Sequence, residues 1–116
     1  MRRESAYVRD ALRAIDELQD FVWQTSRERF LASPPEQSYV FHRLVIFGEA
    51  INRLAGSFQE RYPALPWAQV IALRNRLVHA YFDLDMELVW GIASSRLDEL
   101  RRELKRILET EFPGEE

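Results

Sequence analysis

One short stretch of the chain, residues 74–81 (RNRLVHAY), gathers the side chains best suited to chemistry. It holds two arginines, a tyrosine and His79, one of only two histidines in the sequence. An arginine side chain stays charged in proteins and binds anions, and an imidazole ordinarily changes its charge near neutral pH. The stretch therefore combines a permanent cation with a group able to accept or donate a proton.

In a helix, Arg74 would lie among apolar side chains. With each residue turning by about 100°, it falls near the middle of an apolar stripe that starts at Trp67. A guanidinium there is costly unless an anion or a partner chain meets it. His79 falls on a second face, beside Asn75 and two alanines, where another backbone could approach closely. Ordinary explanations compete with a site: the arginine reaches water or pairs with a core carboxylate, and the histidine interacts with the helix dipole.

The spacing between Arg74 and His79 argues against a simple site within one chain. A straight helix separates positions five apart by about 140° in direction and about 7.5 Å along its axis. The two side chains converge if the helix bends or ends there, or if a second copy supplies the other half. The spacing therefore favours a site at the seam of a dimer.

Length and composition are those of an ordinary globular chain. Its 116 residues predict a single domain, 1–116, and 47% hydrophobic with 30% charged residues is a normal balance. The net charge of −3 argues against a broad basic surface for nucleic acid, although Arg74 and Arg76 would be doubled where two chains meet. There is no cysteine, no apolar run of membrane-spanning length and no signal-peptide core, so a cytoplasmic location is expected.

Hydrophobic spacing predicts an all-α protein with four main helices. The first spans about 5–24 and the second about 36–58, with a short helical turn or loop between them. The third runs from Trp67 to His79 or slightly beyond, and the fourth follows Asp85, its expected N-cap. Short connections between these helices favour an up-down four-helix bundle.

Several other residues have expected structural roles. Ser5 is the expected N-cap of the first helix, and Trp23 is expected to belong to the core. Gly48 lies inside the second helix, where it costs about 1 kcal/mol relative to alanine, which indicates close packing of another helix there. Glu49 follows it and could meet an arginine across the bundle. The tail, residues 112–116, is expected to fray.

Familiar cofactor and metal signatures are missing from the sequence. It contains no phosphate-binding loop, dinucleotide fingerprint, zinc motif or serine nucleophile elbow. His42 has an isoleucine one turn further on and is expected at the surface. With two histidines and no cysteine, a protein-only metal site is not expected, and no cofactor is indicated.

The spacing from Arg74 to Tyr81, Arg-x4-His-x-Tyr, resembles the signature of HEPN-domain proteins, specifically the HepT-like family of toxin–antitoxin ribonucleases. The resemblance extends over nearly the whole chain, with its elements in the same order, and these flanking matches make it specific. The matching segments are Arg9-Asp10 with Ile15, Phe47-Gly48-Glu49-Ala50, Arg61-Tyr62-Pro63, Leu65-Pro66-Trp67, Tyr81-Phe82 and Val89-Trp90.

This resemblance implies a bundle that pairs through a two-fold interface, with Arg74 and His79 of both chains lining a shared cleft. It implies a metal-independent endoribonuclease, the toxin of a type VII-like toxin–antitoxin system, with RNA as substrate. His79 would act as general base or acid, and Arg74 would bind the phosphate. Asn75 could orient the imidazole, and Arg76 is a candidate for phosphate contact.

Tyr81 has a separate expected role. The family's antitoxin resembles a minimal nucleotidyltransferase, and the corresponding tyrosine accepts AMP groups that silence the toxin. An anionic adenylate beside Arg74 would compete with RNA, whereas the ordinary alternative is that Tyr81 packs at a helix end. A different interpretation of the whole chain also stays open. It could be a non-catalytic helical partner module that docks a nucleotidyltransferase, with Arg74 and His79 serving only the interface.

Overall fold

Two long helices form the centre of the fold. The computed structural model describes residues 3–115, except for the side chain of Tyr81, and every regular element in that range is helical. No helix within it is long and apolar enough to cross a bilayer. The prediction of an all-α protein is confirmed. In chain order the elements are α1 (Glu4–Gln24), α2 (Arg27–Ala32), α3 (Pro34–Phe58), α4 (Trp67–His79), the 3-10 helix η1 (Tyr81–Asp83), α5 (Met86–Ser95) and α6 (Leu97–Glu111).

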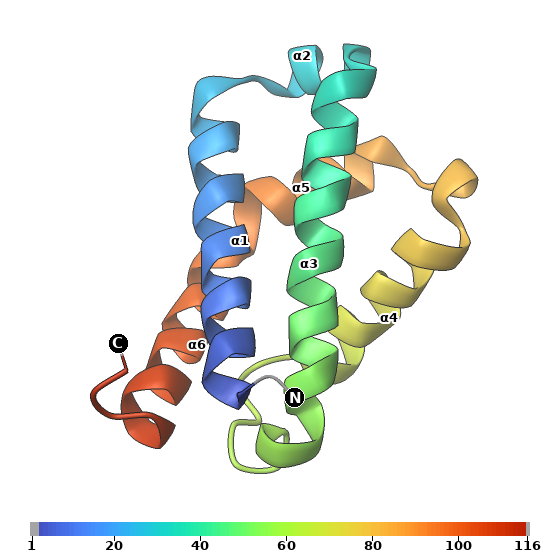
Figure 1. The fold of residues 1–116 in the computed structure, drawn as a ribbon. Coiled ribbons are helices and arrows are strands. Elements are labelled where there is room, and N and C mark those ends of the chain that lie inside the picture. Colours follow the sequence, from blue (N-terminus) through green and yellow to red (C-terminus); the bar gives the residue numbers. More distant parts are fainter. Residues whose placement is uncertain (1–2, 116) are drawn as a thin grey trace.

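The central pair consists of α1 and α3, which run side by side in opposite directions (Figure 1). The helix α6 packs along α1, α5 crosses behind the pair, and α4 packs on α3. Each helix turns residues spaced three and four apart toward the interior, which removes their apolar surface from water. Fully buried side chains include Ile15, Leu18, Phe30, Leu44, Ile51, Leu54, Leu77, Leu104 and Ile107.

The helix α4 depends on α3 for its position. Within the described part of the chain it closely approaches α3 and η1, but neither α5 nor α6. A partly open cavity of about 230 Å³ lies between α4 and the helices α5 and α6. Its apolar lining includes Phe47, Leu73, Ile92 and Leu97. Because α4 carries most of the candidate site residues, its contact with α3 decides where they lie.

Polar caps and prolines set the helix starts. Ser33 caps α3 by accepting a hydrogen bond from the backbone N–H of Glu36, and the dipeptide Pro34-Pro35 forms the first turn. Proline suits that turn because its missing N–H would have no partner there, so α3 begins two residues earlier than expected. The predicted cap of α5 is confirmed: Asp85 Oδ1 accepts from the backbone N–H of Glu87 at 2.9 Å.

The prediction of one continuous last helix was wrong. Arg96, with φ −117° and ψ −1°, separates α5 from α6. Just before it, the Ser95 hydroxyl donates a hydrogen bond to the carbonyl of Gly91, one turn earlier. Serine bonds of this kind bend helices, and Gly and Ser are frequent at kinks. The break lets α5 pack against α2 and α3 while α6 lies along α1.

Three local predictions also failed. Ser5 does not cap α1, which begins one residue earlier; its buried hydroxyl instead donates to Glu115 Oε1 at 2.9 Å. Trp23 is 90% exposed, because it lies at the end of α1 off the packed stripe. The described part of the tail does not fray, since Phe112 packs edge-on against Phe58 with ring centroids 5.9 Å apart.

Candidate active site on α3 and α4

Gly48 allows α4 to approach α3 closely at Arg74. A Cβ added to Gly48 would lie 2.6 Å from the Cβ of Arg74 and 3.0 Å from its Cγ. Both distances are shorter than the 3.5–4.0 Å or so at which non-bonded carbon atoms pack. The aliphatic part of Arg74 therefore fills the space that a larger residue at position 48 would need, which confirms the predicted close packing of another helix.

The guanidinium of Arg74 is held by side chains from both helices. Glu49 Oε2 accepts hydrogen bonds from Nη2 at 2.8 Å and from Nε at 3.3 Å. Asn75 Oδ1 accepts a third bond, from Nη1 at 2.8 Å. The prediction that Glu49 meets an arginine across the bundle is confirmed. A carboxylate partner also explains how the chain tolerates a cation within the apolar stripe of α4.

Arg74 retains donors for a further anion. A guanidinium carries five N–H groups, and the bonds to Glu49 and Asn75 use three of them. The side chain of Arg74 is 23% exposed, so part of it reaches solvent. A planar cation that is already oriented, with N–H groups left on both terminal nitrogens, is suited to a phosphate or carboxylate ligand.

His79 is the last residue of α4, and its side chain is exposed. Its imidazole makes no hydrogen bond or ion pair with any residue that the structure describes. The expected contact from Asn75 is not formed, and the Asn75 side-chain oxygen accepts a hydrogen bond from Arg74. No described residue therefore occupies either ring nitrogen of His79, and both nitrogens can meet a ligand.

Within a single chain, the side chains of Arg74 and His79 lie apart. The two residues belong to one α-helix, Trp67–His79, so the separation of about 140° and 7.5 Å expected from regular geometry holds. Ala68, Ala72 and Asn75, which share the face of His79, are exposed. This face is small enough for a close approach by another backbone. Arg76 is also exposed and pairs with no described residue.

Tyr81 begins η1, directly after the α4 cap at Ala80. Its side chain lies outside the described residues, so the role expected for it stays a prediction. The neighbouring apolar side chains are open to solvent, with Val78 44% and Phe82 96% exposed. The end of α4 thus presents apolar surface beside an exposed histidine.

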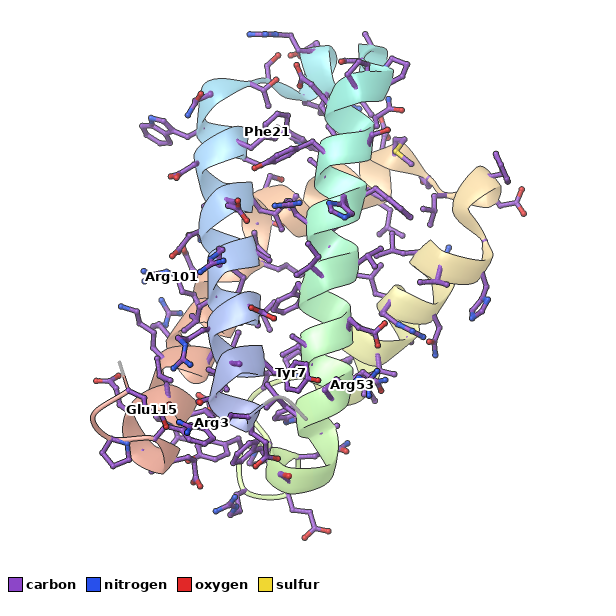
Figure 2. The ribbon with its side chains drawn as sticks, in the orientation of Figure 1. Arg3, Tyr7, Phe21, Arg53, Arg101 and Glu115 are labelled. Atoms are coloured by element: carbon purple, nitrogen blue, oxygen red, sulfur yellow. The ribbon has the colours of Figure 1, made fainter. Side chains whose placement is uncertain are left out.

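Arg53 is a candidate that analysis of the sequence missed. It is exposed on α3, one turn after Glu49, and Figure 2 shows it on the side of α3 nearer α4. The available signal was its i, i+4 spacing from the glutamate that meets Arg74.

The residues do not suggest a metal centre. Among those described, no group of three or more His, Asp or Glu side chains could hold an ion. His42 is exposed, as predicted, and its Nδ1 lies 2.6 Å from Nη2 of Arg43 on the same helix.

Comparison with known proteins decides the family. The family model "Ribonuclease HepT-like" matches residues 11–107, most of the chain and all of α4. This chain belongs to the HepT-like ribonuclease family. This result confirms the resemblance that the sequence indicated, and the all-helical fold is consistent with that family.

Individual relatives carry names of the same kind. A protein of Methanocaldococcus jannaschii named "Putative RNase" is 29% identical over 111 residues, which cover 96% of this chain and 91% of that protein. "Probable ribonuclease HepT" of Thermococcus cleftensis is 27% identical over 106 residues, covering 91% and 96%. A "Putative RNase" of Caldanaerobacter subterraneus subsp. tengcongensis is 28% identical over 111 residues, covering 96% and 99%. No solved structure matches the chain.

Proposed function

We propose that this protein is a metal-independent endoribonuclease whose site combines Arg74 and His79 at the interface of a homodimer. The observation that carries the proposal is the state of Arg74. Glu49 and Asn75 hold its guanidinium, yet two N–H groups remain for an anion, and an exposed histidine lies on the same helix. Membership of the HepT-like ribonuclease family supports RNA as the source of that anion.

The residue types suit cleavage through the ribose itself. An imidazole takes the proton of the 2′-hydroxyl, and the oxygen attacks the adjacent phosphorus. The bond from phosphorus to the 5′-oxygen breaks, and that oxygen takes up a proton, which leaves a 2′,3′-cyclic phosphate and a 5′-hydroxyl. Arg74 stabilises the charge that develops on the phosphate oxygens. Asn75 keeps Arg74 in place, and Arg76 is a further candidate for phosphate contact.

The dimer supplies the convergence that one chain lacks. Arg74 and His79 point about 140° apart on a straight helix, so an Arg74 of one chain would act with a His79 of the other. The exposed small face of α4 suits such an approach. Mixing inactive Arg74→Ala and His79→Ala proteins should therefore restore part of the activity, because each mixed dimer regains one complete pair. If the mixed proteins exchange subunits and stay inactive, the shared arrangement is wrong.

The experiment that tests the activity is cleavage of an RNA by the purified protein in excess EDTA, beside a DNA of the same sequence. We expect the RNA to be cut to products ending in 2′,3′-cyclic phosphate, while the DNA, which lacks the 2′-hydroxyl, stays intact. Cleavage of both nucleic acids, or dependence on added metal, would contradict the mechanism. Arg74→Ala should reduce the rate strongly without unfolding the protein.

We further propose that the protein is the toxin of a toxin–antitoxin system and that AMP transfer to Tyr81 silences it. The hydroxyl would attack the α-phosphorus of ATP and release pyrophosphate, with a cognate minimal nucleotidyltransferase as catalyst. The adenylate would place negative charge near Arg74 and compete with RNA. Tyr81→Phe should keep ribonuclease activity but escape silencing when antitoxin and ATP are added. A variant still silenced and mass-shifted by AMP would place the modification elsewhere.

A second candidate function is a non-catalytic module that docks a nucleotidyltransferase. The exposed Val78 and Phe82 beside the end of α4 favour a protein partner at this place. Expression of this chain alone separates the two functions. Growth arrest that His79→Ala abolishes supports the ribonuclease, whereas harmless expression of an unmodified, folded protein supports the docking module.

A further inference from the structure

Glu49 lies between two arginines and pairs with only one of them. Arg53 follows Glu49 by four residues on α3, a spacing at which glutamate and arginine commonly form an ion pair. Here both hydrogen bonds of Glu49 go to Arg74, across to α4. Arg53 is exposed and makes no hydrogen bond or ion pair with any described residue. Both of these bonds reach Oε2 of Glu49, and Arg53 forms no ion pair with the carboxylate one turn before it.

The parts of α3 and α4 beside Glu49 carry more basic than acidic residues, although the chain as a whole has a net charge of −3. The helix α4 contains no acidic residue, and Glu49 is the one carboxylate in the stretch of α3 from position 37 to position 58. Arg53, Arg74 and the exposed Arg76 thus outnumber the one carboxylate of these two segments, while Glu4 of α1 accepts a hydrogen bond from Ser57, one turn after Arg53. A local surplus of this kind attracts an anionic backbone.

The order of these groups follows from the direction of the helices. The helices α3 and α4 run in opposite senses where they meet, with Gly48 against Arg74 (Figure 1). A step from Arg74 to His79 rises about 7.5 Å in one direction, and a step from Glu49 to Arg53 moves about 6 Å in the other. Along the helix direction, Arg53 and His79 therefore lie on opposite sides of Arg74, although the side chains of Arg74 and His79 point about 140° apart.

We propose that Arg53 binds a phosphate of the RNA that neighbours the one held at Arg74, on the side away from the His79 of the same chain. The inference rests on the proposed ribonuclease function and extends its site from α4 onto α3. Arg53 takes no part in proton transfer. It tracks the backbone and is indifferent to base identity, as phosphate contacts generally are. Arg53 is available for that contact because it pairs with no described residue, Glu49 included.

The test measures RNA binding without cleavage. Arg53→Gln is introduced into the His79→Ala protein, and binding of a labelled single-stranded RNA is followed by fluorescence anisotropy over a series of salt concentrations. Removal of a phosphate contact should weaken binding several-fold at low salt. Because one cation fewer then neutralises the RNA backbone, the slope of log K against log salt should become shallower by about 0.7. In active protein the same change should raise KM and leave kcat nearly unchanged.

The matched control is Arg102→Gln. Arg102 is exposed on α6, a helix whose backbone does not closely approach α4, and it pairs with no described residue. The substitution removes the same charge at a place away from the proposed site. The affinity for RNA and the slope of log K against log salt should therefore stay at the values of the His79→Ala parent. Equal behaviour of the Arg53 and Arg102 variants would overturn the role of Arg53 alone. A folded His79→Ala parent that binds no RNA would instead refute the proposed function.

Discussion

Gly48→Ala adds one methyl group at the contact between α3 and α4. That methyl carbon would lie 2.6 Å from the Cβ of Arg74, and the carbon one bond further out would be 3.0 Å away. Non-bonded carbons require about 3.5–4.0 Å, so the helices have to separate by about 1 Å there. The atoms in the way belong to the stem of Arg74 near its backbone, which has little freedom to move aside.

Two opposing effects set the magnitude. Alanine is favoured over glycine inside a helix by about 0.5–1 kcal/mol. Overpacking a close contact costs about 1–3 kcal/mol. We expect Gly48→Ala to be destabilising by about 1–2 kcal/mol in sum. A shift of Arg74 by about 1 Å should also reduce RNA cleavage by as much as about 100-fold.

Gly56→Ala is the matched control. Gly56 lies on the same helix, and an added Cβ there meets nothing within 4 Å. The same substitution should therefore stabilise the protein by about 0.5–1 kcal/mol. The assay is urea unfolding followed by circular dichroism, at equal protein concentrations because a dimer's stability depends on concentration. Equal stabilisation by both substitutions, with cleavage unchanged, would refute the close contact at Arg74.

Three further predictions concern single side chains. Glu49→Gln removes the charge that holds Arg74, so cleavage should fall about 10- to 100-fold in a protein that stays folded; an unchanged rate would show that this pairing does not position the arginine. Burial and the hydrogen bond to Glu111 raise the pKa of Tyr62, and the protonated phenol is therefore favoured by folding. That contribution is complete below the unfolded pKa near 10 and is lost as pH rises through the higher folded pKa. In urea unfolding, Tyr62→Phe should therefore lose less stability than wild type as pH rises above about 10. Parallel losses would contradict the assignment. Asp85→Ala removes the cap of α5 and should cost about 1 kcal/mol in the same assay, whereas no change would mean that the cap is dispensable.

Much of the fold could be predicted because apolar spacing and caps are local signals. The stripes of α1, α3 and α4 follow correctly from residues three and four apart, and the cap at Asp85 needed only its type and position. Gly48 and Arg74 were informative for a related reason. A glycine inside a helix and an arginine inside an apolar stripe each break a local rule, and both departures are explained at one contact.

Other features depend on tertiary context that spacing does not carry. The apolar pattern continues through Arg96, so it gave no warning that α5 and α6 would separate there. Trp23 is a residue type common in cores, but its side chain lies on the exposed side of α1. The spacing of Arg53 from Glu49 is that of an ordinary ion pair on a helix, and only the structure shows that Glu49 bonds Arg74 and not Arg53. The predicted convergence of Arg74 and His79 requires a second chain and stays a proposal.

The measurement that tests the central claim most directly is the rate of RNA cleavage in excess EDTA by wild type, His79→Ala and His42→Ala. The two histidines are both exposed on helices, but only His79 lies on the helix that carries Arg74. We expect His79→Ala to lose cleavage while its circular dichroism spectrum stays native, and His42→Ala to cleave at the wild-type rate. Equal cleavage by all three proteins, or equal loss in both variants, would contradict the assignment of the active site to His79.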